Sequence, residues 1–197
     1  MPMTRCEARA IVIRCARMYQ DNLCDKNLLF VYFVGSDVEV VSIFCQRSNF
    51  KHLTGIEANC TPIDFFDYCK RGIITEQQIR FKKNGTSVLK LRVLEDIMNI
   101  AHKAKFLGDY LNSNIYLELD KVVGNVSCGL GVEKDEEREY YPKSVLNGDM
   151  RKQVNNMKPI VAVFEKLSVE SRYRLVKMKD TLKEEQKNSI NAFVDTL

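Results

Sequence analysis

Two histidines, His52 and His102, are the side chains of this 197-residue chain whose unperturbed pKa suits proton transfer in both directions near neutral pH. His52 follows an apolar stretch that we interpret as a strand, and Gly55 just after it allows the backbone to turn sharply beside a ligand. A general acid or base is one interpretation of His52, and a structural hydrogen-bonding residue is the other. His102 fits the exposed side of a helix, so we place it outside the site.

Four further side chains could handle the charge and protons of a phosphodiester. Cutting RNA without a metal needs a base for the 2′-hydroxyl, an acid for the departing 5′-oxygen, and cations or fixed donors for the charge on phosphate. Thr54 could hold a phosphate oxygen, and Lys90 and Lys121 could stabilise charge. Tyr141 could donate a proton or stack on a base. The structural alternatives are a turn residue for Thr54, solvated charges for the lysines and a core aromatic for Tyr141.

A basic stretch runs from Lys70 to Arg92, and Glu76 is its only acidic residue. Such a stretch could follow a phosphate backbone. The RNA contacts are expected from Arg80, Lys82, Lys83 and Arg92. An ordinary solvated face is the alternative. The net charge of the whole chain, +4, permits nucleic-acid binding but does not by itself argue for it.

The sequence offers no convincing metal site. Its seven cysteines stand singly, without the paired spacing of zinc sites, and we expect them to be mostly reduced, buried, small apolar residues. Asp64, Asp67 and Asp109 are separated and fit helix or turn positions better than a two-metal cluster. We therefore expect neither a metal nor an organic cofactor.

Helices are predicted along the whole chain from apolar residues at three- and four-residue spacing. The first begins at Thr4, which forms a capping box with Glu7. The next helix is expected over residues 61–72, and a short helical turn follows at 75–78. Residues 88–104 are expected to form one long or broken helix, whose first turn could instead be a strand. A last helix is expected from Thr181 onward. In the last of these the apolar residues lie mostly in the final turns, so the segment either docks weakly or projects.

Strands are predicted in two groups. Residues 28–34 and 38–45 form a hairpin across Gly35. Later strands are expected in the alternating segment 115–120, in the apolar stretches 122–132 and 159–164, and over 172–178. The charged run 133–139 fits a solvated loop at a hairpin end.

These elements are mixed and partly segregated along the chain, which indicates an α+β fold rather than repeated βαβ units. With 45% hydrophobic residues, a chain of 197 residues can bury one core. We expect residues 1–180 to form a single domain and 181–197 a C-terminal helical extension. Because the chain shows neither a secretory signal nor an apolar run long enough to span a bilayer, we expect it in the cytoplasm with no membrane partner.

Several short motifs occur in an order that resembles a known nuclease family. They are Phe50–Gly55, Asp64–Phe66, Leu89–Leu91, Gly108–Asp109, Asp120–Ser127 and Tyr140–Pro142. Together they are similar to the fourth group of the phage-associated barnase–EndoU–colicin E5/D–RelE-like nucleases, from the first helix to about Lys166. The resemblance implies N-terminal helices on a small, mainly antiparallel sheet and metal-independent ribonuclease activity. Lys143 departs from the pattern, in which asparagine is often found.

The leading hypothesis is therefore a metal-independent endoribonuclease, a toxin or effector of a phage or mobile element. With one plausible acid–base histidine and no metal-ligand cluster, the tethered 2′-hydroxyl of RNA is the most accessible nucleophile. Its partners would be RNA and an antitoxin, immunity protein or host protein. The alternative is a catalytically inactive RNA- or protein-binding inhibitor of the same fold. Convergence of His52, Lys90 and either Thr54 or Lys121 on one cleft would favour the enzyme, and scattered positions would favour the binding protein.

Overall fold

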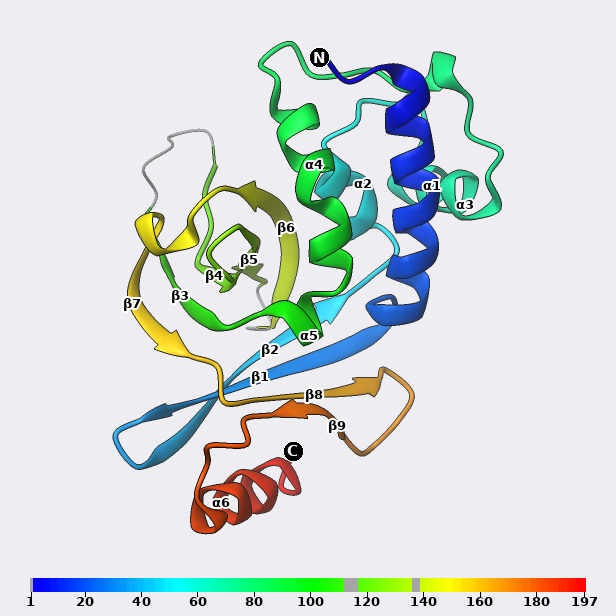
Figure 1. Cartoon of the computed structure of the whole chain (residues 1–197). Helices are drawn as coiled ribbons and strands as arrows, with labels where there is room; N and C mark the ends of the chain where they lie inside the picture. Colours follow the sequence, from blue (N-terminus) through cyan, green and yellow to red (C-terminus); the bar gives the residue numbers. More distant parts are fainter. Residues whose placement is uncertain (1, 112–116, 136–138) are drawn as a thin grey trace.

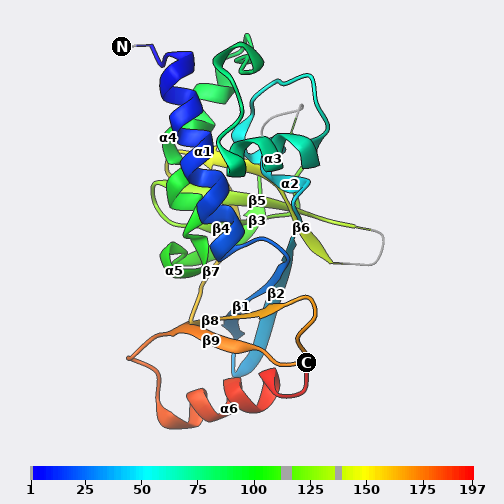
Figure 2. The same ribbon diagram turned by 90° about the vertical axis from the view of Figure 1, so that its right-hand side faces the viewer.

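The computed structural model describes residues 2–111, 117–135 and 139–197, and these form an α+β fold (Figure 1). The helices of residues 5–98 gather at one end of the molecule and the C-terminal helix, residues 184–194, lies at the other end (Figure 2). The predicted fold class is confirmed. The sheet has nine strands within the described residues, so the expectation of a small sheet was wrong.

Helix α1 (Arg5–Asn22) begins as the sequence predicts. The Thr4 hydroxyl accepts a hydrogen bond from the Glu7 backbone N–H, and the Glu7 carboxylate accepts one from the Thr4 backbone, so two N–H groups that the helix leaves unpaired are satisfied. The buried face carries Ala8, Val12 and Tyr19 into the core. This helix packs against α3 and α4.

The next helices follow their local signals. Helix α3 (Pro62–Arg71) starts at the Thr61 cap and ends at Gly72, whose φ of 73° is in the left-handed region. A short 3₁₀ turn, η1 (Glu76–Gln78), follows. The predicted helix over 88–104 is broken at Asn99 into α4 (Thr86–Met98) and α5 (Ile100–Lys103).

The sheet has the order β7-β3-β4-β5-β6-β2-β1-β8-β9. Neighbours are antiparallel except β2 and β6, which run parallel and meet at Ile43 and Tyr140. The strands are β1 (Lys26–Val34), β2 (Asp37–Cys45), β3 (Phe106–Tyr110), β4 (Lys121–Gly124), β5 (Cys128–Lys134), β6 (Tyr140–Asn147), β7 (Val154–Pro159), β8 (Ala162–Leu167) and β9 (Arg174–Met178). A 3₁₀ turn, η2 (Met150–Lys152), precedes β7.

The strand predictions agree with the structure to different degrees. The stretch 122–132 is divided into β4 and β5 by residues 125–127, and the stretch 159–164 spans the end of β7 and the start of β8. The hairpin across Gly35 is confirmed as β1 and β2, and the strand predicted over 172–178 is confirmed as β9. The strand predicted over 115–120 was wrong for residues 117–120, which are irregular and precede β4, while 115 and 116 lie outside the described residues. The charged run does connect the β5–β6 hairpin, with residues 136–138 outside the described part.

Three apolar clusters are found in the described residues. The main core lies between α1–α5 and the sheet, and it contains five of the seven unpaired cysteines together with a group of aromatic rings. A small cluster around Val122 and Met150 packs on β3, β4, β6 and β7. Another cluster joins α6 (Glu184–Val194) to β1 and β8, with Ile190 and Val194 buried against Leu29 and Phe164. Helix α6 therefore docks on the sheet.

Candidate active site

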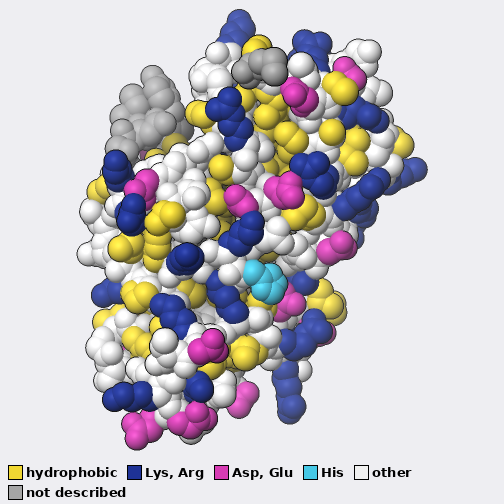
Figure 3. Space-filling view, viewed as in Figure 1, with side chains coloured by type: hydrophobic (Ala, Val, Ile, Leu, Met, Phe, Trp, Pro, Cys, Tyr) yellow, Lys and Arg dark blue, Asp and Glu magenta, His cyan; other side chains and the backbone are white. Residues whose placement is uncertain are grey.

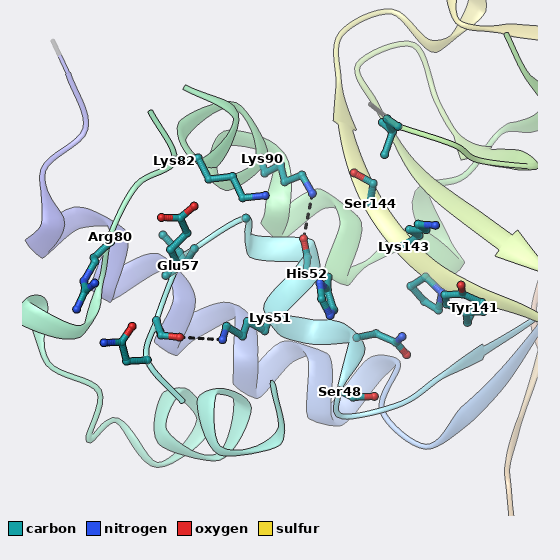
Figure 4. Close-up of a pocket in the computed structure, with 17 residues that line it drawn as sticks. Ser48, Lys51, His52, Glu57, Arg80, Lys82, Lys90, Tyr141, Lys143 and Ser144 are labelled. Atoms are coloured by element: carbon teal, nitrogen blue, oxygen red, sulfur yellow. Dashed lines mark hydrogen bonds between the residues drawn. The ribbon is translucent and has the colours of Figure 1, made fainter. Parts of the chain in front are cut away.

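A cavity of about 790 Å³ opens between a short helix, α2 (Asn49–Thr54), the loop that follows it, helix α4 and strand β6 (Figure 4). We call it the His52 pocket. Five of the residues predicted to act in catalysis or RNA binding line it: His52, Arg80, Lys82, Lys90 and Tyr141. Lys51 and Lys143 add two further cations, and Glu57 is the one carboxylate among the lining residues. The cavity is therefore strongly cationic.

Helix α2 aims His52 at this pocket. Its residues Phe50 and Leu53 are fully buried, and the Phe50 ring packs against the rings of Tyr19, Phe65 and Phe66. Burial of that face leaves His52 exposed at the mouth of the cavity. The sequence-based placement of His52 at the end of a strand was wrong, because β2 ends at Cys45 and a separate helix carries the histidine.

Gly55 ends α2 and lets α4 approach closely. Its φ of 67° is in the left-handed region, as expected of a sharp turn. A Cβ atom at this position would lie 3.0 Å from Cδ of Lys90 and 3.3 Å from Cα of Ser87. Glycine therefore allows the Lys90 side chain to pass directly over the turn.

The buried hydroxyl of Ser87 ties three parts of the pocket together. Its Oγ donates to the Gly55 carbonyl at 2.7 Å and accepts from the Lys82 backbone N–H at 2.8 Å. The loop after α2 and the segment carrying Lys82 are thus fixed to the first turn of α4. Ser87 was not predicted as a site residue, because a serine in a helix acquires this role only through its burial, which the sequence alone does not reveal.

Lys90 and His52 are electrostatically linked. The Lys90 Nζ donates to the His52 carbonyl oxygen at 3.0 Å. Burial, with Lys82 nearby, lowers the pKa of Lys90 to about 8. Partial burial and the cations Lys90, Lys51 and Lys82 lower the pKa of His52 below its usual value. The imidazole is therefore neutral near pH 7 and able to accept a proton, and the ammonium beside it is still mostly charged.

Strand β6 supplies the opposite wall of the pocket. The Tyr141 hydroxyl and the Lys143 ammonium both donate to the Glu133 carboxylate on β5. The hydrogen bond to Glu133 and then burial raise the pKa of Tyr141 to about 12. Tyr141 consequently keeps its proton, and that proton points at Glu133. Lys143, the residue that departs from the family pattern, lies in the pocket with its charge partly neutralised.

The loop after α2 is held by Lys51 and by a backbone bridge. The Lys51 Nζ donates to the carbonyl oxygens of Ala58 and Cys60, at 2.9 and 2.7 Å. Glu57 and Arg80 exchange backbone hydrogen bonds of 3.0 and 3.1 Å, which sets these opposite charges side by side. Neither Lys51 nor Glu57 was predicted as a site residue, because short loop contacts leave no periodic signal in the sequence.

Four predicted site residues lie outside the pocket lining. Thr54 is fully buried, with its hydroxyl donating to the Lys51 carbonyl and accepting from the Ile56 N–H. Lys121 on β4 pairs with Asp109, which also accepts from Asn156. Lys83 is exposed, and Arg92 lines a separate surface hollow beside the start of α1. His52 and Lys90 therefore converge, and neither Thr54 nor Lys121 joins them.

Within residues 2–111, 117–135 and 139–197, no three His, Cys, Asp or Glu side chains lie close enough together to hold a metal ion. No helix of the described part is long and apolar enough to cross a membrane.

Comparison with known proteins gives one family match. A family model described as phage-Barnase-EndoU-ColicinE5/D-RelE like nuclease4 matches residues 11–190. Neither the curated proteins nor the solved structures gave a match. The matched range includes every residue that lines the His52 pocket.

Proposed function

The chain belongs to the phage-associated barnase–EndoU–colicin E5/D–RelE-like nucleases of the fourth group, and from this premise we propose that it is a metal-independent endoribonuclease acting at the His52 pocket. One observation carries the proposal: a neutral imidazole sits among five cations in a single cavity. Cations attract a phosphodiester, and an uncharged histidine beside it is ready to take a proton. The phage association in the family description supports a role as toxin or effector of a phage or mobile element.

The reaction that suits these groups is attack by the RNA's own 2′-hydroxyl. His52 accepts the proton of that hydroxyl, the 2′-oxygen forms a bond to phosphorus, and the bond from phosphorus to the 5′-oxygen breaks. The Lys90 ammonium, whose pKa is about 8, is placed to stabilise the phosphate charge and to give a proton to the leaving oxygen. The products are a 2′,3′-cyclic phosphate and a free 5′-hydroxyl. The nucleophile is tethered beside the phosphate, so no activated water is needed.

Other groups of the pocket would hold the RNA. Arg80 and Lys82 lie on the side of α4, and Lys143 lies on the side of β6, so a phosphate backbone between them meets cations on both walls (Figure 4). The proton of Tyr141 is committed to Glu133, so we assign its ring, rather than its hydroxyl, to the substrate as a surface for base stacking. Thr54 and Lys121 touch no substrate in this scheme, and Thr54 instead shapes the turn that ends α2.

A catalytically inactive inhibitor that binds RNA or a protein is the second candidate. The observation in its favour is that Glu133 engages both Tyr141 and Lys143 on β6, so that the protons of these two groups are directed at a carboxylate rather than at a substrate. In that case the protein would act by binding its partner in a fixed ratio. The partner, which could be an antitoxin, an immunity protein or a host protein, would not be controlling an enzyme.

The test is to incubate the purified protein with total RNA in excess chelator and to map the fragment ends. We expect cyclic phosphate and 5′-hydroxyl ends, with DNA and 2′-O-methylated RNA left intact. His52→Ala should lower cleavage by about a hundredfold or more, the scale of losing a general base, and added imidazole should restore part of it. Chelator-sensitive cleavage or 5′-phosphate ends would exclude this mechanism. Tight RNA binding without cleavage would favour the inhibitor.

A further inference from the structure

A second cavity, of about 640 Å³, lies where α5 and the turn between β4 and β5 meet strand β9 and the connection between β7 and β8. Its lining includes four lysines, Lys103, Lys105, Lys177 and Lys179, and a single carboxylate, Asp96. We call it the lysine pocket. It shares no lining residue with the His52 pocket. On the molecular face that carries α5, Lys and Arg side chains gather over this region (Figure 3).

Carboxylates neutralise only part of this positive charge. Asp96 pairs with Lys103. The Lys177 ammonium donates to the carbonyl oxygens of His102 and Ala104 at the end of α5, which uses two of its three protons and cancels none of its charge. In the described part of the chain, neither Lys105 nor Lys179 has a carboxylate within ion-pair distance. Three positive charges in the cavity are thus without a counter-charge.

Holding these charges together is unfavourable for the protein alone. Burial, with Lys179 and Lys105 nearby, lowers the pKa of Lys177 to about 8, so its charged form is disfavoured there. An anion in the cavity would relieve both the repulsion and the desolvation of Lys177. Asn125 and Ser127 at the rim offer neutral hydrogen-bonding groups of the kind that phosphate oxygens accept from.

We propose that the lysine pocket binds phosphate groups of the RNA strand at a distance from the cut site, as a second contact that extends the substrate footprint. The proposal rests on RNA being the ligand of the His52 pocket. Helices α5 and α2 lie apart in the view of Figure 2, and the two pockets have no lining residue in common. We therefore expect a short RNA to occupy one pocket at a time and a long strand to reach both.

The test compares fluorescently labelled tetra-uridylate and a 30-nucleotide uridylate by anisotropy over a range of salt concentrations. The variant is Lys105→Gln with Lys179→Gln, which leaves the hydrogen bonds of Lys177 intact. We expect its affinity for the long RNA to fall roughly tenfold and its salt slope to drop by about 1.4, since each lost phosphate contact on a single strand removes about 0.7. Affinity for the tetramer should not change.

The matched control is Lys152→Gln with Lys187→Gln, which removes the same charge outside both pockets. Its affinity for the long RNA should stay within about twofold of that of the parent, because the lower net charge weakens RNA binding only slightly. If the parent binds the long RNA and the pocket variant matches this control, the second RNA contact is refuted while the proposed function stands, and an acidic protein surface becomes the candidate occupant. If the parent binds neither RNA, both proposals fail.

Discussion

Protonation of His52 should determine how the rate of RNA cleavage falls at low pH. A general base must be neutral, so kcat/KM should rise with pH through a midpoint below the ordinary histidine pKa of about 6.5, because partial burial and the nearby lysines lower this pKa. Lys90 acts as a cation and as the proton donor to the leaving oxygen, so activity should fall again above pH about 8 as it loses its proton. The pH profile of kcat/KM on an RNA substrate measures both limbs.

A control separates the two groups. Lys90→Arg keeps a charge that does not titrate below pH 12, so the alkaline fall should disappear, even if the maximum rate is lower. A profile in which the alkaline limb stays near pH 8 in this variant would remove Lys90 from the mechanism. An acid midpoint above 7 would contradict the electrostatic environment of His52.

At this scale the sequence identified part of the site for a clear reason. His52 was found because its chemistry is rare in this chain, which has only two histidines. Three site residues were not predicted, because residues of their types are common and their roles arise from contacts made in the fold. They are Lys51, Glu57 and Ser87. Thr54 was a plausible phosphate ligand in sequence, but its hydroxyl is used within the α2 turn.

At the scale of elements, the site depends on the hydrogen bonds of Ser87, which hold the turn after α2 against the start of α4. Ser87→Ala leaves the buried Gly55 carbonyl and the part-buried Lys82 N–H without their partner. A buried unpaired group costs about 1–3 kcal/mol, and water can reach the residue Lys82, so we expect the free energy of unfolding to fall by about 2 kcal/mol. Cleavage by the folded protein should fall about tenfold, because Lys82 and the His52 turn lose their common anchor.

Urea unfolding and single-turnover cleavage on the same preparation would measure the two effects. Thr86→Ala is the matched control, since its hydroxyl contacts only the neighbouring Asn84 at the surface. It should change stability by less than about 0.5 kcal/mol. Equal losses of activity in the two variants would mean that the start of α4, rather than the Ser87 contacts, governs the site.

The basic segment before α4 gives a second prediction at this scale. Lys82 lines the His52 pocket, whereas its neighbour Lys83 is exposed outside it. Lys82→Gln should therefore weaken RNA binding and lower the salt slope by about 0.7, one phosphate contact on a single strand. Lys83→Gln, with the same change of charge, should leave the slope unchanged. Equal slopes in the two variants would favour the alternative of an ordinary solvated face.

Elements were predicted well where a local signal marks their ends. Each of these signals depends on a few residues that are close together in the sequence. They are the capping box of α1, the Thr61 cap and the Gly72 end of α3, and the Gly35 turn. Helix α2 escaped detection because six residues are too few to display a helical period. The wall opposite His52 could not be foreseen, since it depends on the parallel pairing of β2 with β6 across nearly a hundred residues.

At the scale of the whole molecule, the functional pocket and the docking of α6 involve different parts of the fold. The His52 pocket is built from α2, α4 and β6 on the main core, while α6 covers a separate apolar cluster on β1 and β8. The sequence predicted the helix and the apolar residues of its final turns. It could not predict the docking surface, because Leu29 and Phe164 become neighbours only through the β1–β8 pairing. We propose that residues 181–197 stabilise the domain without taking part in cleavage.

Ile190→Ala tests this division of roles. Ile190 is fully buried between α6 and the sheet, and truncation of a buried isoleucine to alanine costs about 2–5 kcal/mol. For a chain of this length, that loss corresponds to a fall in Tm of roughly 5–15 °C. The cleavage rate per folded molecule, measured well below the new Tm, should stay within about twofold of the parent. Ser189→Ala, beside it on the exposed side of α6, should leave both Tm and rate unchanged. A large loss of cleavage at temperatures where Ile190→Ala is fully folded would mean that α6 and the His52 pocket are coupled through the sheet, and that the extension belongs to the functional unit.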